Sequence, residues 1–175
     1  MKRPLILIAD DHPPTAGLLR GLLEPEFSVI GDVRDGSALV LAAAALVPDV
    51  IVSDIGMPCL DGITAAERIL LANPAMRVVL VSVFTDWPIV QRGFAAGALG
   101  FVSKQDAGDD LVAAVRAALC GRQHLSRSIQ QPWYNASSRP STAVTSRRSS
   151  RLMRKTPGCL SIRQNYWPAA RRSCA

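Results

Sequence analysis

Five short apolar runs constrain the fold of this chain more than any other feature. They recur at intervals of about twenty to thirty residues and cover residues 5–10, 27–33, 49–54, 77–83 and 100–104. The runs are mostly continuous rather than alternating, as expected of strands that are covered on both faces. Segments with helical spacing follow each of them: 14–24, 36–47, 62–73, 86–97 and 107–121. The alternation predicts an α/β fold, a (βα)5 doubly wound parallel sheet with helices on both faces.

Charge divides the chain into two parts. Residues 1–125 contain all 14 acidic residues and 10 of the 20 Lys and Arg residues, for a net charge of 10 − 14 = −4. Residues 126–175 contain the other 10 basic residues and no acidic residue, together with ten serines and four prolines. This second part lacks a sustained apolar period, so it cannot bury enough surface to offset the entropy of ordering. We therefore expect one domain over residues 1–125 and a disordered basic tail over residues 126–175.

Neither a membrane protein nor a protein stabilised by disulfides or zinc is predicted. The first apolar run, Leu5–Ala9, has five residues, whereas a membrane span needs about 20. A cytoplasmic protein without membrane association is therefore expected. The four cysteines form no CxxC pair, and Cys59 and Cys120 are expected to be small apolar packing residues.

Polar residues stand at the carboxyl ends of four of the five predicted strands. Asp10 and Asp11 end the first, Asp54 the third, Ser82 the fourth and Lys104 the fifth. Ligands of open parallel sheets bind at this edge, so three carboxylates, a hydroxyl and an ammonium are expected in one pocket. Each residue alone has a simpler interpretation, as a helix cap or a solvated charge, but the agreement of four strand ends favours a functional site.

The chemistry of this set suggests a magnesium site and a phosphoryl group. Three clustered carboxylates repel one another unless a cation joins them, and oxygen ligands suit Mg²⁺. A lysine and a hydroxyl offer a positive charge and a hydrogen-bond donor to phosphoryl oxygens. Asp54, which lies between them, could accept the phosphoryl group as an aspartyl-phosphate.

Three stretches of the sequence resemble the receiver domain of two-component response regulators of the NarL/FixJ (LuxR-type) family. They are "ILIADDHPPTAGLLRGLLE", "PDVIVSDIGMPCLDGI" and "AAGALGFVSKQDAGDDLVAAVRAALCGRQHLS", and the resemblance covers residues 4–126. It implies a flavodoxin-like receiver fold with strand order 2-1-3-4-5. Three positions depart from the family pattern: Val83 stands where a smaller residue is common, Cys59 where glycine is common and Trp87 where an acidic residue is common. We interpret Trp87 as half-buried packing at the start of a helix rather than as a partner contact.

The resemblance also implies a role for each residue of the site. Asp54 would be the phosphoacceptor, and Asp10, Asp11, Asp54 and the backbone carbonyl of Gly56 would hold Mg²⁺. A sensor histidine kinase would be the phosphodonor. The chain would act as a signalling switch rather than an enzyme, with at most self-catalysed phosphotransfer and dephosphorylation.

The expected response to phosphorylation involves three further residues. Ser82 would be the switch hydroxyl, Lys104 the ion-pair partner of the phosphoryl group, and Phe101 the aromatic residue that changes rotamer together with Ser82. The surface expected to change is formed by residues 87–120, through which a homodimer could also form. The charge and the acceptor oxygens of a phosphoryl group would bias this surface between two states.

The tail leaves the output of the switch open. A helix-turn-helix domain normally follows the receiver in this family, but residues 126–175 show no such pattern, so specific DNA binding is not expected. Residues 144–147, "VTSR", resemble the LTxR motif that opens this domain. If residues 148–153 are back-translated and read one base later, permitted codons allow the ExxVL motif that normally follows. We therefore interpret the tail as the out-of-frame remnant of a DNA-binding domain.

Two other functions remain as alternatives. Arginine clusters and the aromatic residues Trp133, Tyr134, Tyr166 and Trp167 could allow a transcription regulator to bind DNA through its tail. An aspartyl-phosphate phosphatase is the enzyme alternative. Such enzymes usually place a second aspartate two residues after the nucleophile, where this chain has Gly56.

Overall fold

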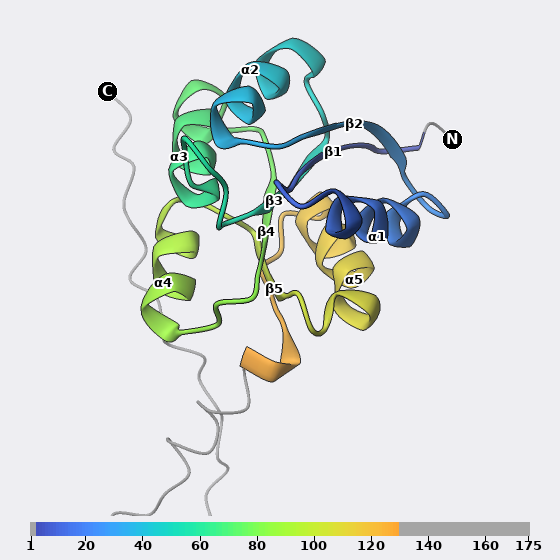
Figure 1. The fold of residues 1–175 in the computed structure, drawn as a ribbon, viewed down its shortest axis with the longest axis vertical. Coiled ribbons are helices and arrows are strands. Elements are labelled where there is room, and N and C mark those ends of the chain that lie inside the picture. The colour runs from blue at the N-terminus through green and yellow to red at the C-terminus, as the bar shows by residue number, and fades with distance from the viewer. Residues whose placement is uncertain (1–2, 130–175) are drawn as a thin grey trace, which may run out of the picture. The chain divides into compact units, whose positions relative to one another are not determined.

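The computed structural model describes residues 3–129, which form one parallel sheet flanked by helices (Figure 1). The strands are β1 (Leu5–Ala9), β2 (Ser28–Val33), β3 (Val50–Asp54), β4 (Val78–Ser82), β5 (Gly100–Ser103) and β6 (His124–Leu125). The helices are α1 (Pro13–Leu23), α2 (Gly36–Leu46), α3 (Gly62–Ala72), α4 (Trp87–Ala95) and α5 (Ala107–Leu119).

The sheet has the order β2-β1-β3-β4-β5-β6, and all neighbouring strands are parallel. This arrangement confirms the predicted (βα)5 fold and the order 2-1-3-4-5. The sequence patterns did not predict β6, a strand of two residues that pairs with β5. The strand order reverses between β1 and β3, because β2 lies on one side of β1 and β3 and the later strands lie on the other. The crevice typical of doubly wound folds therefore lies at the carboxyl ends of β1 and β3.

Helices cover both faces of the sheet and divide the core into two layers. Helices α1 and α5 pack on one face, against residues such as Ile6, Val52 and Val81. Helices α2, α3 and α4 pack on the other face, against residues such as Leu7 and Leu80. Every residue of β3 and β4 is buried. This double coverage explains why these strands are continuous apolar runs.

Within residues 3–129, two residues other than glycine have backbone conformations that disfavour side chains with a Cβ. Val47, the C-cap of α2, has φ +45°, and Cys59, in the loop after β3, has φ +64°. The prediction that Cys59 and Cys120 are packing residues is wrong, because both are exposed. Cys59 lies in a turn with left-handed backbone geometry, which accounts for the glycine common at this position in the resemblance. Trp87 is half-buried at the start of α4 and packs on the core, as predicted.

The described fold continues beyond residue 125. Ser126 is fully buried, and Ile129 is 3% exposed. The boundary between the domain and the tail stays a prediction. The predictions of a disordered tail and of an out-of-frame remnant concern residues that lie almost entirely outside the described ones. Among residues 3–129, no helix is long and apolar enough to cross a membrane.

Candidate functional site

The carboxyl ends of four neighbouring parallel strands place the predicted site residues at one edge of the sheet. Asp10 and Asp11 follow β1, Asp54 and Ser82 are the last residues of β3 and β4, and Lys104 follows β5. Of the three carboxylates, Asp10 and Asp54 are buried and Asp11 is exposed. The order of the strands therefore joins residues that are far apart in the sequence.

Lys104 joins two of the carboxylates directly. Its Nζ donates hydrogen bonds to Oδ2 of Asp10 at 2.9 Å and to Oδ2 of Asp54 at 2.8 Å. Burial lowers the pKa of Lys104, but the hydrogen bonds and charges of Asp54 and Asp10 outweigh this effect, so the net pKa is raised. Lys104 is thus held as an ammonium between the two buried carboxylates.

The remaining oxygen of each buried carboxylate accepts a backbone hydrogen bond. Oδ1 of Asp10 accepts from the His12 N–H at 2.9 Å, and Oδ1 of Asp54 accepts from the Ile55 N–H at 2.7 Å. These bonds fix the orientation of both carboxylates. They leave further lone pairs on each oxygen for a cation, because a carboxylate oxygen can accept more than one partner.

The three carboxylates fit a divalent cation in geometry and in charge. One oxygen each from Asp10, Asp11 and Asp54 lies within 4.8 Å of the other two. The three carboxylates and the Lys104 ammonium sum to −3 + 1 = −2. A cluster of oxygens with this net charge suits Mg²⁺, which binds through one or two carboxylates and keeps several waters.

Ser82 and Phe101 lie on the two strands beside this cluster. The Ser82 hydroxyl accepts a hydrogen bond from the Phe84 N–H at 2.9 Å, and the Ser82 carbonyl accepts one from the Lys104 N–H at 2.8 Å. The Phe101 side chain is fully buried. It packs close to α4, since a Cβ added at Gly93 would lie 3.2 Å from the Phe101 ring.

Close backbone packing behind Asp54 was not predicted from the sequence. A Cβ added at Gly62, the first residue of α3, would lie 1.9 Å from the Asp54 carbonyl oxygen. Ser53 Oγ donates a hydrogen bond of 2.8 Å to the same oxygen. Asp61 caps α3 by accepting from the N–H groups of Ile63 and Thr64. A turn is visible in the Asp61-Gly62 sequence, but the approach of α3 to β3 that requires glycine is not.

Gly56 lies two residues after Asp54, in the loop between β3 and α3. Hydrogen bonds from the Met57 and Gly62 N–H groups to the Ile55 carbonyl fold this loop back on itself. The role of the Gly56 carbonyl as a metal ligand stays a prediction.

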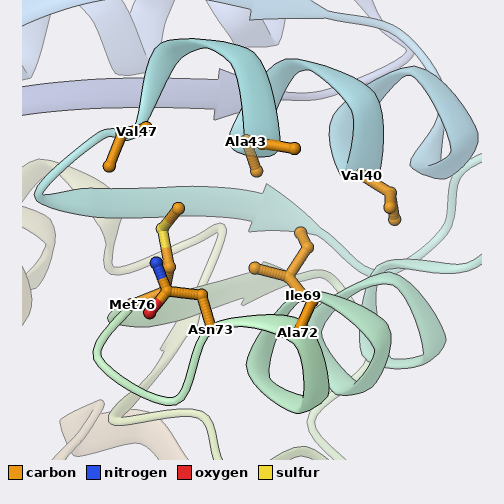
Figure 2. A pocket seen from close by; sticks show the side chains of 8 residues that line it. Val40, Ala43, Val47, Ile69, Ala72, Asn73 and Met76 are labelled. Carbon is orange, nitrogen blue, oxygen red and sulfur yellow. The ribbon is translucent and has the colours of Figure 1, made fainter.

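A separate cavity lies between α2 and α3, as Figure 2 shows. Its volume is about 240 Å³, and its lining consists of Val40, Ala43, Ala44, Val47, Ile69, Ala72, Asn73 and Met76. No lining residue is titratable, and Val47 and Met76 lie near the amino ends of β3 and β4, away from the carboxylates. The cavity is therefore unsuited to the chemistry expected of the carboxylate cluster.

Proteins similar in sequence to this chain include response regulators and a transcriptional regulatory protein. The chain is 31% identical to the response regulator GacA of Pseudomonas protegens over 139 residues, which cover 78% of this chain and 65% of that protein. It is 33% identical over 118 residues to the uncharacterised transcriptional regulatory protein YxjL of Bacillus subtilis, with coverage of 66% and 54%. The match thus spans less than two thirds of the length of either relative.

Solved structures and a family model agree with these relatives. The signal receiver domain of NarL from Mycobacterium tuberculosis is 29% identical, with a TM-score of 0.67 and coverage of 70% of this chain and all of that one. The receiver domain of RcsB from Salmonella enterica, solved with a beryllofluoride phosphomimetic, is 27% identical, with a TM-score of 0.69 and coverage of 74% and 98%. The family model described as "Response regulator receiver domain" matches residues 6–116. The chain therefore belongs to the response regulator receiver domain family.

Proposed function

We propose that Asp54 accepts a phosphoryl group from the phosphohistidine of a sensor kinase, with Mg²⁺ held by Asp10, Asp11, Asp54 and the Gly56 carbonyl. Phosphorylation of an aspartate and binding of Mg²⁺ are typical of receiver domains. The observation that carries the proposal is the position of Lys104, whose ammonium lies 2.8 Å from Asp54 Oδ2 in a cluster with a net charge of −2. A cytoplasmic location accompanies this function.

Asp54, Ile55 and Lys104 would each have a role in the transfer. A carboxylate oxygen of Asp54 forms the new bond to phosphorus while the bond from phosphorus to the donor imidazole breaks. Mg²⁺ would neutralise the phosphoryl oxygens as the bond forms. Lys104 is close enough to Asp54 to pair with the transferred group, and the backbone bond from Ile55 holds the carboxylate in place.

Ser82 would then respond to the phosphoryl group. Its hydroxyl accepts from Phe84 in the described state and has a proton of its own to donate to a phosphoryl oxygen. Movement of Ser82 toward Asp54 would break the bond to Phe84 and alter the packing around Phe101. We place the output on the surface of residues 87–120 and propose that a homodimer forms through it, as RcsB, a similar protein, is described as dimers on DNA.

Incubation with acetyl phosphate and Mg²⁺, followed by intact-mass measurement, tests the acceptor. The wild-type chain should gain one phosphoryl group, and Asp54→Asn should gain none. Asp86→Asn is a matched control, because Asp86 is an exposed aspartate in the loop before α4 and makes no side-chain cap bond. Phosphorylation of Asp54→Asn at the wild-type rate would overturn the assignment.

Catalysis on external substrates is not part of the proposal. Receiver domains are generally not enzymes, and Gly56 offers no general acid two residues after Asp54. Sustained hydrolysis of phosphoesters by the wild-type chain, absent from Asp54→Asn, would instead establish the phosphatase alternative.

A role in transcription rests on the names of relatives and on the basic residues of the tail. YxjL is named a transcriptional regulatory protein, but the match covers only 54% of its length. The coding DNA beyond codon 148 tests the interpretation of the tail as an out-of-frame remnant, which fails if no other frame encodes a helix-turn-helix pattern. DNA binding that decreases steeply with salt, and that is lost when residues 130–175 are removed, would support the transcription alternative.

A further inference from the structure

Residues 124–129, here called the strap, follow α5; residues 124–126 lie along the edge of β5, and residues 127–129 form a helical turn. Residues His124 and Leu125 form β6, in register with Gly100 and Phe101 of β5. The strap continues this pairing, because the Ser126 N–H donates to the Phe101 carbonyl at 3.0 Å. The strap is therefore bonded directly to the backbone of the residue expected to change rotamer on phosphorylation.

Two carboxylates of α5 and its N-cap clamp the strap. Ser126 Oγ lies 2.6 Å from Asp106 Oδ2 and 3.0 Å from Asp110 Oδ2. The same two oxygens accept backbone hydrogen bonds, Asp110 from the Arg127 N–H and Asp106 from the Ser128 N–H, each at 3.1 Å. Hydrogen bonds from Ser126 and Ser128 lower the pKa of Asp106, so this carboxylate stays ionised as an acceptor.

The end of the strap is anchored in the core on the face of the sheet that α2, α3 and α4 cover. Ile129 is 3% exposed and belongs to the same buried cluster as Phe101 and Val90 of α4. Its N–H donates to the Ser126 carbonyl at 3.1 Å. All four backbone N–H groups from Ser126 to Ile129 thus have partners, and Ile129 adds an apolar anchor in the cluster that contains Phe101.

Phe101 and α4 are both connected to the phosphoacceptor site. Phe101 lies on β5, three residues before Lys104, and pairs in register with Leu80 of β4, two residues before Ser82. Ser82 accepts from Phe84, in the loop that leads into α4. A shift of Ser82 toward Asp54 would therefore disturb α4 and Phe101 together, and Val90 of α4 and Phe101 belong to the buried cluster that contains Ile129.

We propose that the strap is the element through which phosphorylation of Asp54 reaches the chain beyond Ile129. In the unphosphorylated domain, the carboxylate clamp and the Ile129 anchor hold the strap against β5. In the phosphorylated domain, the rearranged packing around Phe101 no longer accommodates Ile129, and the strap detaches from β5 and α5. This inference rests on the function proposed above and adds a specific exit route for the signal.

Hydrogen exchange of the full-length chain tests the proposal, with beryllofluoride and Mg²⁺ compared with Mg²⁺ alone. Amides of residues 126–129 should exchange about tenfold faster or more with beryllofluoride, while those of β1 should not change. Bound beryllofluoride is monitored separately by ¹⁹F NMR, and its signal should be absent from Asp54→Asn. Trypsin cleavage after Arg127 gives a second measurement in the wild-type chain and should also become faster.

Ser126→Ala tests the clamp, because it removes the hydroxyl that lies within hydrogen-bond distance of both carboxylates. Its strap amides should exchange fast with or without beryllofluoride, and its ¹⁹F signal should remain. Ser37→Ala, at an exposed position of α2, is the matched control and should behave as wild type. The control is expected to keep the slow exchange of the strap in Mg²⁺ alone.

The outcomes separate the two proposals. A bound ¹⁹F signal together with unchanged or slower exchange and cleavage of the strap would overturn the strap proposal and leave the phosphoacceptor assignment intact. Absence of a bound signal in the wild-type chain would overturn both. Wild-type exchange in Ser126→Ala would overturn the role of the clamp.

Discussion

Replacement of Asp11 by asparagine should stabilise the domain without magnesium and make its stability insensitive to magnesium. Asp11 is exposed, and one of its oxygens lies within 4.8 Å of an oxygen of Asp10 and an oxygen of Asp54. Lys104 pairs with Asp10 and Asp54 but with no oxygen of Asp11. The Asp11 carboxylate therefore faces two negative charges and one positive charge, a net charge of about −1.

Coulomb's law gives the size of the effect. Two unit charges 4.8 Å apart repel by about 0.9 kcal/mol in water and by about 3.5 kcal/mol at an effective dielectric constant of about 20. The exposure of Asp11 favours the lower end, so Asp11→Asn should raise the free energy of unfolding by about 1 kcal/mol without magnesium. Magnesium at about ten times its dissociation constant should stabilise the wild-type chain by about 1.4 kcal/mol, and the variant should lose most of this gain.

Urea denaturation in EDTA and in excess MgCl₂ measures both quantities. The variant should be more stable than wild type in EDTA and of similar stability in magnesium. Asp86→Asn is the control, because Asp86 is an exposed aspartate outside the cluster. Asp86 is also the N-cap of α4, so its replacement should cost a few tenths of a kcal/mol at most and keep the magnesium response.

Two results would refute this reasoning. If Asp11→Asn is less stable than wild type in EDTA, repulsion among the three carboxylates does not limit the stability of the metal-free domain. If magnesium stabilises the variant as much as wild type, Asp11 is not part of the magnesium site. Either result would be measured under the same conditions as the control.

Three further perturbations follow from the packing and the charges. Gly62→Ala should lower the free energy of unfolding, measured by urea denaturation, by about 1–3 kcal/mol or more, because the added Cβ would lie 1.9 Å from the Asp54 carbonyl oxygen. Gly17→Ala is the control: a Cβ at this position of α1 meets no atom within 4 Å, so this variant should be more stable than wild type by about 0.5–1 kcal/mol. Val47→Asn should raise the free energy of unfolding by about 1 kcal/mol, since φ is +45° and Val47 is 61% exposed; an unchanged melting temperature would contradict this. The pKa of Lys104 is raised in the folded domain, so protonated Lys104 stabilises the domain fully below its unfolded pKa of about 10.4. This contribution to the free energy of unfolding is lost as the pH rises through the pKa of Lys104 in the folded state. The stability difference between wild type and Lys104→Met should therefore be constant from pH 7 to about 10 and narrow only above that range.

The fold could be predicted because its strongest signals are local. A continuous apolar run indicates a strand covered on both faces, and the helical spacing between the runs implies parallel crossovers. β6 was missed for the same reason, because a strand of two residues carries no periodicity. The exposure of Cys59 and Cys120 was missed because a small apolar residue in a turn or just beyond a helix gives no signal of burial or exposure.

The sequence predicted which residues form the candidate site but not the contacts between them. Residues at the carboxyl ends of parallel strands meet at one edge of the sheet, which brought Asp10, Asp54, Ser82 and Lys104 into one hypothesis. The Lys104 bridge to both carboxylates and the close approach of Gly62 to Asp54 depend on distances set by the packing of whole elements. The roles of these residues in phosphotransfer remain proposals for the experiments above.

The sequence by itself determined the class of fold, the order of its elements and the chemical groups at the edge of the sheet. These properties follow from spacing along the chain and from the handedness and parallel pairing of βαβ units. Only the tertiary structure decided that Lys104 spans carboxylates 94 and 50 positions away, and that Ser126 closes a clamp on α5 and β5. The physical reason is that side-chain hydrogen bonds require sub-ångström placement of residues remote in sequence, which only the packed core provides.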